Sequence, residues 1–149
     1  MPRKFFFISV IFLVLGLDQI SKAAVLTRLP EGSSIPVTFF FHLTRVNNSG
    51  AAFGLLKNSG IFLIAMSWVC VLALGAVICL KKTFFWADFA PPLILAGALG
   101  NLADRLRYGY VIDFLDFRIW PVFNLADVSI TLGLFLAAIE IFRSRPQAS

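Results

Sequence analysis

The stretch IFLIAMSWVCVLALGAVICL, residues 61–80, contains no charged residue and consists almost entirely of apolar side chains. A helix of about 20 apolar residues is long enough to cross the hydrocarbon core of a lipid bilayer. Residues 61–80 therefore predict a membrane-spanning helix, and with it an integral membrane protein.

The composition of the whole chain agrees with this prediction. Of the 149 residues, 59% are hydrophobic and only 14% are charged, whereas soluble domains have about 45–50% apolar and about 25% charged residues. The mean hydropathy is +0.87, and 17 phenylalanines suit a lipid-facing surface better than a small soluble core. The length indicates one domain.

Three further apolar runs have nearly the length of a membrane span: residues 5–26, 86–103 and 122–142. We therefore predict an α-helical integral membrane protein with four transmembrane helices in a single membrane-embedded domain, residues 1–149. The first run also resembles a secretory signal, because Arg3 and Lys4 precede an apolar segment. Asp18 interrupts the region in which such a signal would be cut, so we favour a retained first helix.

Four spans place both termini on the same side of the membrane. The positive-inside rule makes that side the cytoplasm, because short basic segments lie there: residues 3–4, 81–82 and 143–145. The formal net charge of +5 is then explained by cations that flank the membrane. The sequence contains no clustered basic face of the kind that binds nucleic acid.

Residues 27–60 form the longest predicted segment outside the membrane. Residues 35–46 are rich in Val, Thr and Phe and lie between clusters of turn-forming residues, which is typical of a strand or hairpin. Residues 48–57 are apolar and predict a short helix at the membrane interface. The other outer segment is residues 104–121.

Ionisable residues at membrane depth are costly and usually mark function. Here they gather near the predicted outer face, as three pairs at helical spacing and two acids in an apolar string: Asp18 with Lys22, Asn101 with Asp104, Asn124 with Asp127, and Asp113 and Asp116 within VIDFLDF. Apart from the pair of Asn101 and Asp104, each also has a structural interpretation, namely an ion pair at the end of a helix, a helix cap, or a turn.

Several carboxylates at one interface suggest a particular chemistry. Two carboxyl groups held close together share a proton, because both cannot ionise easily. One can then act as a base on water and the other as an acid toward a peptide bond. The chain has a single histidine, His42, and no Cys and His spacing typical of a metal site, so we expect hydrolysis without a metal or cofactor.

Five stretches resemble, in the same order, the motifs of the lipoprotein signal peptidases (signal peptidase II). They are DQISK at 18–22, NSGAAFG at 48–54, GALGNLADR at 97–105, VIDF at 111–114 and FNLAD at 123–127. Each motif alone is modest, but all five in order are highly specific. The segment at 117–122 is short for this family, which leaves its conformation open.

This resemblance implies an aspartic endopeptidase with Asp113 and Asp127 as the catalytic pair. The residues implied to bind substrate or support the site are Asp18, Lys22, Asn48, Gly50, Asn101, Asp104, Arg105, Asn124 and Ala126. The implied fold has four transmembrane helices, a small periplasmic β-cradle and a short interfacial helix. The implied substrate is a diacylglyceryl-modified prolipoprotein, cut before its lipidated cysteine in the bacterial cytoplasmic (inner) membrane, with membrane phospholipid around the site.

Two other functions compete with this one. A small proton- or cation-coupled transporter would use similar aspartates as an ion path, but it predicts acids through the depth of the membrane. Here Asp88 and Glu140 lie near the predicted inner side and the other aspartates near the outer side. A non-catalytic assembly subunit would leave Asn124 and Asp127 without a role.

Overall fold

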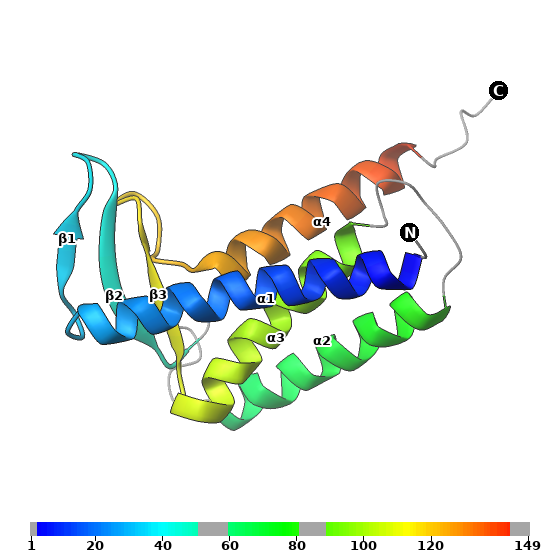
Figure 1. The fold of residues 1–149 in the computed structure, drawn as a ribbon, viewed down its shortest axis with the longest axis horizontal. Helices are drawn as coiled ribbons and strands as arrows, with labels where there is room; N and C mark the ends of the chain where they lie inside the picture. The colour runs from blue at the N-terminus through cyan, green and yellow to red at the C-terminus, as the bar shows by residue number, and fades with distance from the viewer. Residues whose placement is uncertain (1–2, 51–59, 81–88, 144–149) are drawn as a thin grey trace.

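The computed structural model describes residues 3–50, 60–80 and 89–143. In these ranges the chain forms helices and strands in the order α1 (Arg3–Arg28), β1 (Ser34–Pro36), β2 (His42–Asn48), α2 (Gly60–Leu80), α3 (Ala90–Tyr108), β3 (Val111–Asp116) and α4 (Leu125–Arg143). Figure 1 shows a bundle of helices with the strands gathered at one end. The protein is thus mostly helical with one small sheet.

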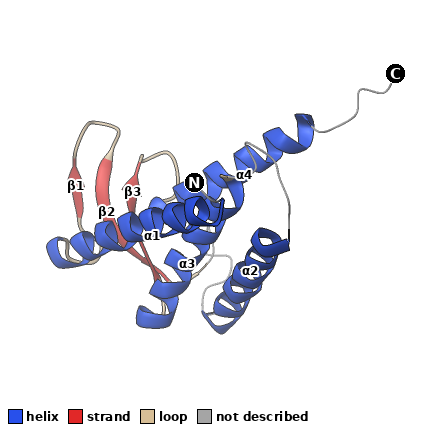
Figure 2. Ribbon diagram, turned by 45° about the vertical axis from the view of Figure 1, so that its right-hand side comes forward, coloured by secondary structure: helices blue, strands red, loops and turns tan. Residues whose placement is uncertain are grey.

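Helix α3 lies at the centre of the bundle and packs against α1, α2 and α4. Helices α1 and α3 end near the sheet, whereas α2 and α4 begin at that end of the bundle (Figure 1). The start of α1 and the end of α4 both lie at the opposite end. Figure 2, from a second direction, shows the sheet at the same end of the bundle, with the last turns of α1 running alongside its strands.

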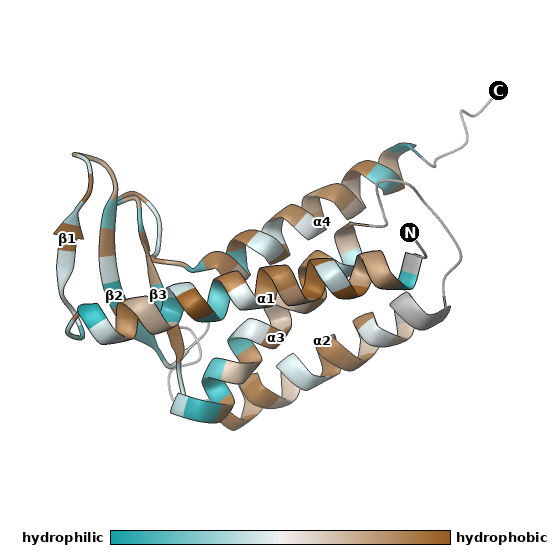
Figure 3. Ribbon diagram, in the orientation of Figure 1, coloured by the Kyte–Doolittle hydropathy of each residue, from teal (hydrophilic) through white to brown (hydrophobic). Residues whose placement is uncertain are grey.

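Hydrophobic residues predominate along the helices of the bundle (Figure 3). Many of their large side chains are exposed, among them Phe12 on α1, Ile61 on α2 and Phe135 on α4. Among the described residues, α1 over Lys4–Arg28 and α4 over Leu125–Arg143 are long and apolar enough to cross a membrane, and Ile61–Ala76 of α2 is a shorter apolar helix. Soluble monomers rarely expose contiguous apolar patches of this kind. The surface therefore suits lipid, as the composition predicts, while four crossings remain a prediction.

The observed helix bounds correct the third predicted span. Helix α3 does not end at residue 103 but continues to Tyr108, and residues 86–88 lie outside the described residues. Gly109 ends the helix with a φ of 79°, and its N–H donates to the carbonyl of Arg105 at 3.0 Å. Glycine adopts this left-handed conformation without strain, so it ends helices well.

The three strands form an antiparallel sheet in the order β1-β2-β3. The predicted hairpin is confirmed by the pairing of β1 with β2, in which Ser34 lies opposite Thr44. Asp113 and Asp116 lie on β3, so the alternative interpretation of a turn there is wrong. Asn48 ends β2 instead of starting an interfacial helix, and the rest of that predicted helix, from residue 51, lies outside the described residues.

A small apolar core joins the sheet to the end of α1. It contains Val25 and Leu29 from α1 and Ile112 and Phe114 from β3, all of which are buried. Alternation along a strand turns Asp113 to the opposite face from these two β3 side chains. The core therefore fixes β3 against α1 and directs Asp113 toward the helix bundle.

Small residues let α3 and α4 approach closely. A Cβ on Gly97 would collide with the carbonyl of Ala126, and one on Gly133 would lie 2.9 Å from the carbonyl of Ala90. Close packing through small residues is typical of helix pairs in membranes. Ser129 adds a 2.7 Å hydrogen bond to the carbonyl of Leu93. Together these contacts set the first turns of α4 beside the first half of α3.

Candidate active site

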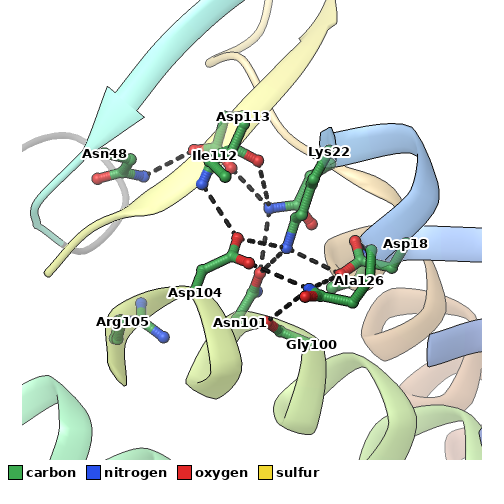
Figure 4. A network of polar contacts seen from close by, with 12 residues as sticks. Asp18, Lys22, Asn48, Gly100, Asn101, Asp104, Arg105, Ile112, Asp113 and Ala126 are labelled. Carbon is green, nitrogen blue, oxygen red and sulfur yellow. Dashed lines mark hydrogen bonds and ion pairs between the residues drawn. The ribbon is translucent and has the colours of Figure 1, made fainter. Parts of the chain in front are cut away.

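Lys22 lies at the centre of a buried ion cluster (Figure 4). Its Nζ lies 2.9 Å from Asp18 Oδ2 and 2.8 Å from Asp104 Oδ2, and it donates to Asn101 Oδ1 at 3.0 Å. These contacts use all three ammonium donors. Only 1% of Lys22 is exposed. The predicted pair of Asp18 and Lys22 is therefore confirmed, and Asp104 pairs with Lys22.

The two carboxylates of this cluster also hold backbone groups from other elements. Asp18 Oδ1 accepts from the N–H of Ala126 at the start of α4, at 2.9 Å. Asp104 Oδ2 accepts from the N–H of Ile112 on β3, at 3.2 Å. The cluster thus connects α1, α3, β3 and α4, and each charge has partners that offset the cost of its burial.

Asp113 reaches the other side of this network from β3. Asn48 donates to Asp113 Oδ2 at 2.9 Å, and Asn124 donates to Oδ1 at 2.7 Å. The N–H of Gly50 binds Asn48 Oδ1 at 3.0 Å, which directs the amide NH₂ of Asn48 toward the carboxyl group. Asp113 is 2% exposed. The side chains that hydrogen-bond to it in the described part of the chain are thus neutral amides.

Burial raises the pKa of Asp113 to about 7. The hydrogen bond from Asn48 opposes this rise, whereas the negative charge of Asp127 adds to it. Desolvation and a neighbouring like charge both favour the protonated form of a carboxyl group. Asp113 can therefore hold or release a proton near neutral pH.

Asp127 lies in the first turn of α4, where the helix dipole favours negative charge. Its Oδ2 accepts from the N–H of Asn124 at 3.2 Å, and its own N–H donates to Asn124 Oδ1 at 2.9 Å. This reciprocal pair is a capping box, so Asn124 caps the helix as its structural interpretation predicts. Asn101 donates to Asp127 Oδ1 at 2.9 Å.

Two amides connect Asp113 to Asp127. The Nδ2 of Asn124 binds both Asp113 Oδ1, at 2.7 Å, and Asn101 Oδ1, at 3.1 Å. Asn101 in turn donates to Asp127. Asp127 is only partly buried, whereas Asp113 is almost fully enclosed. One carboxyl group is thus open to an incoming molecule, and the other is withdrawn from water.

Arg105 borders the site from α3. Its charge interacts with the charges of Asp127, Asp113 and Asp104, and its Nη1 donates to Ser67 Oγ on α2 at 3.3 Å. Arg105 therefore contributes positive potential and connects two helices.

The structure brings nearly all the predicted site residues into one network. The members are Asp18, Lys22, Asn48, Gly50, Asn101, Asp104, Asp113, Asn124, Ala126 and Asp127, with Arg105 at its border. Asp116 lies outside it and binds Thr44 at 2.7 Å and the N–H of Arg118 at 2.8 Å. Among the described residues, no three His, Cys, Asp or Glu side chains gather closely enough to hold a metal ion.

Our prediction missed Gln19. Its Nε2 donates to Asp104 Oδ1 at 3.0 Å and to the carbonyl of Gly100 at 3.3 Å, and its Oε1 accepts from Arg107 at 2.9 Å. Gln19 thus tightens the contact between α1 and α3 beside the ion cluster. The signal for it was its position next to Asp18 in the first motif.

Comparison with solved structures defines the class of the protein. The fold superposes with a TM-score of 0.90 on a bacterial membrane enzyme solved by the in meso method at 2.3 Å, which is 31% identical, with 97% of this chain and 92% of that chain covered. A second bacterial membrane enzyme, solved at 1.9 Å, gives a TM-score of 0.85 at 32% identity over 94% of each chain. The arrangement of helices and sheet is thus that of a bacterial membrane enzyme.

Sequence comparison gives the family. The family model described as Signal peptidase (SPase) II matches residues 10–143. The lipoprotein signal peptidase of Moorella thermoacetica is 48% identical over 91% of each chain, and that of Pelotomaculum thermopropionicum is 45% identical over 97% of this chain and 96% of the relative. The chain therefore belongs to the signal peptidase II family and is a peptidase. These comparisons give no support to the transporter alternative.

Proposed function

We propose that this protein is an aspartic endopeptidase that removes the signal peptide from diacylglyceryl-modified prolipoproteins, cutting before the lipidated cysteine. Asp113 and Asp127 are the proposed catalytic residues. The observation that carries the proposal is the pair of carboxyl groups connected through Asn101 and Asn124, one of them with a pKa raised to about 7. Family membership supports the choice of substrate.

In the proposed mechanism, Asp127 takes a proton from a water molecule as the water oxygen attacks the scissile carbonyl carbon. Asp113 gives its proton to the carbonyl oxygen. When the tetrahedral intermediate collapses, the carbon–nitrogen bond breaks, the leaving nitrogen takes the proton from Asp127, and Asp113 recovers its own. Acid–base steps of this kind typically contribute about 10²–10⁴-fold each. The chemistry is complete with two carboxyl groups and water.

The supporting residues have positioning roles in this proposal. Asn48 and Asn124 hold Asp113, while Asn101 and the capping box hold Asp127. The Lys22 cluster fixes the elements that carry both groups. Fixed geometry matters because groups that are already in position avoid reorganisation during the reaction.

The proposed setting is the bacterial cytoplasmic membrane, with four transmembrane helices in one domain and both termini in the cytoplasm. The sheet would form the periplasmic β-cradle, and the dyad would lie near the outer face. This setting suits a lipidated substrate, since each buried methylene group of its acyl chains is worth about 0.8 kcal/mol. The cysteine would therefore stay at the interface, at the same depth as the dyad in the proposed topology.

The test is cleavage of a synthetic peptide by the purified, detergent-solubilised protein. The peptide contains a signal sequence and a diacylglyceryl cysteine, and mass spectrometry identifies the fragments. We expect one cut before the modified cysteine, with far less cleavage of the same peptide without lipid. Intact lipidated peptide in the presence of folded protein would refute the proposed activity.

The topology has its own test. In a variant without Cys70 and Cys79, a single cysteine is placed at position 49 or at position 83. A membrane-impermeant thiol reagent added to intact cells, whose outer membrane is permeabilised if they have one, should label position 49 and not position 83. The reverse pattern would reject the orientation without affecting the proposed chemistry.

A further inference from the structure

A cavity of about 510 Å³ opens beside Asp127. One wall comes from the connection between β3 and α4, and the other from the first two turns of α4. The residues that line it are Phe117, Ile119, Trp120, Phe123, Asp127, Val128, Thr131 and Leu132. The polar network does not use this cavity, although Asp127 belongs to both.

We propose that this cavity holds one acyl chain of the diacylglyceryl group on the substrate cysteine. The inference rests on the proposed function and assigns a place to the lipid part of that substrate. It follows from the direction, chemistry and opening of the cavity.

The direction of the cavity follows α4. Asp127, Val128, Thr131 and Leu132 have the spacing of one face of a helix. From Asp127 to Leu132 the helix rises about 7.5 Å, and α4 runs away from the sheet (Figure 1). An occupant that begins at the proposed catalytic group therefore extends along the helix, in the direction that an acyl chain takes into a membrane.

The chemistry of the walls favours a hydrocarbon chain over a peptide segment. Among the described residues that line the cavity, only Asp127, Thr131 and Trp120 have polar side-chain atoms. A peptide in such a place would need partners for its N–H and C=O groups, whereas a polymethylene chain needs none. Phe117 and Phe123 stack with ring centroids 5.9 Å apart, which gives a flat apolar surface at the end nearest the sheet.

The cavity also opens in a suitable direction. Leu132 is 51% exposed on the outside of α4, and Trp120 is 65% exposed at the rim. If α4 crosses the membrane as proposed, this opening faces the acyl chains of the bilayer. A substrate chain can then slide in sideways, and it covers apolar surface that is otherwise exposed.

The test compares two lipidated peptides that differ only in their acyl groups, palmitoyl or octanoyl. The wild-type protein and a Leu132→Trp variant, whose added indole narrows the cavity, cleave both peptides under identical micelle conditions. The readout is the ratio of kcat/KM for the long-chain substrate over the short-chain one. We expect the ratio to fall about tenfold, which corresponds to lost burial of about two methylene groups.

Leu134→Trp is the matched control. Leu134 is also exposed on α4, at 56%, but it lies two residues further along, on the opposite face of the helix. This variant should keep the wild-type ratio. Leu132→Ala, which enlarges the cavity without overpacking, should shift the preference toward longer chains.

The outcomes separate this inference from the proposed function. If the wild-type protein cleaves neither peptide, the proposed function fails. If it cleaves both but Leu132→Trp and Leu132→Ala leave the chain-length ratio unchanged, the acyl-chain inference is overturned. If Leu132→Trp instead changes the preference among peptides with different side chains before the cleavage site, the cavity binds the signal peptide and the inference is also overturned.

Discussion

Two clusters of carboxyl side chains lie side by side in this protein, and they differ in their partners. In the first, Lys22 lies between Asp18 and Asp104, at 2.9 and 2.8 Å. In the second, Asp113 and Asp127 are bound by the amides of Asn48, Asn101 and Asn124. Across residues 3–50, 60–80 and 89–143, no lysine or arginine forms an ion pair with either member of the second group.

This difference separates structure from chemistry. A cation between two carboxylates stabilises their charged forms and makes the cluster a fixed support. Neutral amides hold a carboxyl group in position but favour its charged form less than a cation does. The carboxyl group can therefore still take up and release a proton. The Lys22 cluster is therefore expected to determine whether the protein folds, and the Asp113 and Asp127 pair whether it reacts.

The largest effect is expected from Asp113→Asn and Asp127→Asn. Each change keeps the size and much of the hydrogen bonding of the side chain but removes its acid–base function. Cleavage of the lipidated peptide should fall by at least about 10²-fold, while thermal unfolding stays close to that of the wild-type protein. Wild-type cleavage by either variant would show that the catalytic pair has been assigned wrongly.

The next effect concerns the ion cluster. Lys22→Met leaves two buried carboxylates without their cation, which should lower the free energy of unfolding by about 3–5 kcal/mol. Asp104→Asn should cost less, because Lys22 keeps Asp18 as a partner. Denaturant unfolding of both variants shows which of them loses more unfolding free energy. If the Lys22→Met protein is fully stable yet inactive, Lys22 takes part in the reaction, and the distinction between a structural cluster and a catalytic pair fails.

A smaller effect is expected from pH. Since the pKa of Asp113 is raised to about 7, its acidic form is present below that pH and disappears above it. If Asp113 supplies the proton, kcat/KM should fall about tenfold for each pH unit above about 7. The residual activity of Asp113→Asn should not show this decline. A wild-type profile that stays flat well above pH 7 would exclude Asp113 as the proton donor.

The amino-acid sequence predicts the apolar helices and the clustering of the polar residues well. Runs of apolar residues correspond to α1, α2 and α4, and polar residues at i, i+3 and i, i+4 spacing mark Asp18, Lys22, Asn101 and Asp127. Both signals are local, because they depend only on helical spacing and on the cost of charge in an apolar segment. The assignment of Asp113 and Asp127 to catalysis depends on the family motifs.

Features that depend on tertiary contacts were harder to predict. The VIDFLDF segment pairs with β2 as a strand, whereas a turn was the alternative interpretation of its two acids. The partners of these acids, Asn48 and Thr44, are distant in sequence and could not be predicted from the segment itself. The partner of Asp104 is Lys22 from another helix, which spacing within one segment cannot indicate. The predicted end of the third helix was wrong for a related reason, since Gly109 and not the loss of hydrophobicity ends it.

The smallest expected effect belongs to Asp116, which shares β3 with Asp113 and serves as its matched control. Because Asp116 is three residues from Asp113, its side chain points to the opposite face of the strand. There it accepts hydrogen bonds from Thr44 and from the backbone and side chain of Arg118. Desolvation raises the pKa of Asp116, but these bonds outweigh it, and the pKa lies below its usual range. Asp116→Asn should lower the free energy of unfolding at neutral pH by only about 1–2 kcal/mol, with cleavage within a few-fold of wild type. A lowered pKa in the folded protein stabilises it fully only above the pKa of the unfolded chain. The difference in unfolding free energy should therefore shrink as the pH falls through the range in which carboxyl groups titrate.

The measurement is denaturant unfolding at neutral and acidic pH alongside peptide cleavage. A loss of activity as large as that of Asp113→Asn would mean that any change on β3 disables the enzyme, and the special role of Asp113 would lose its support.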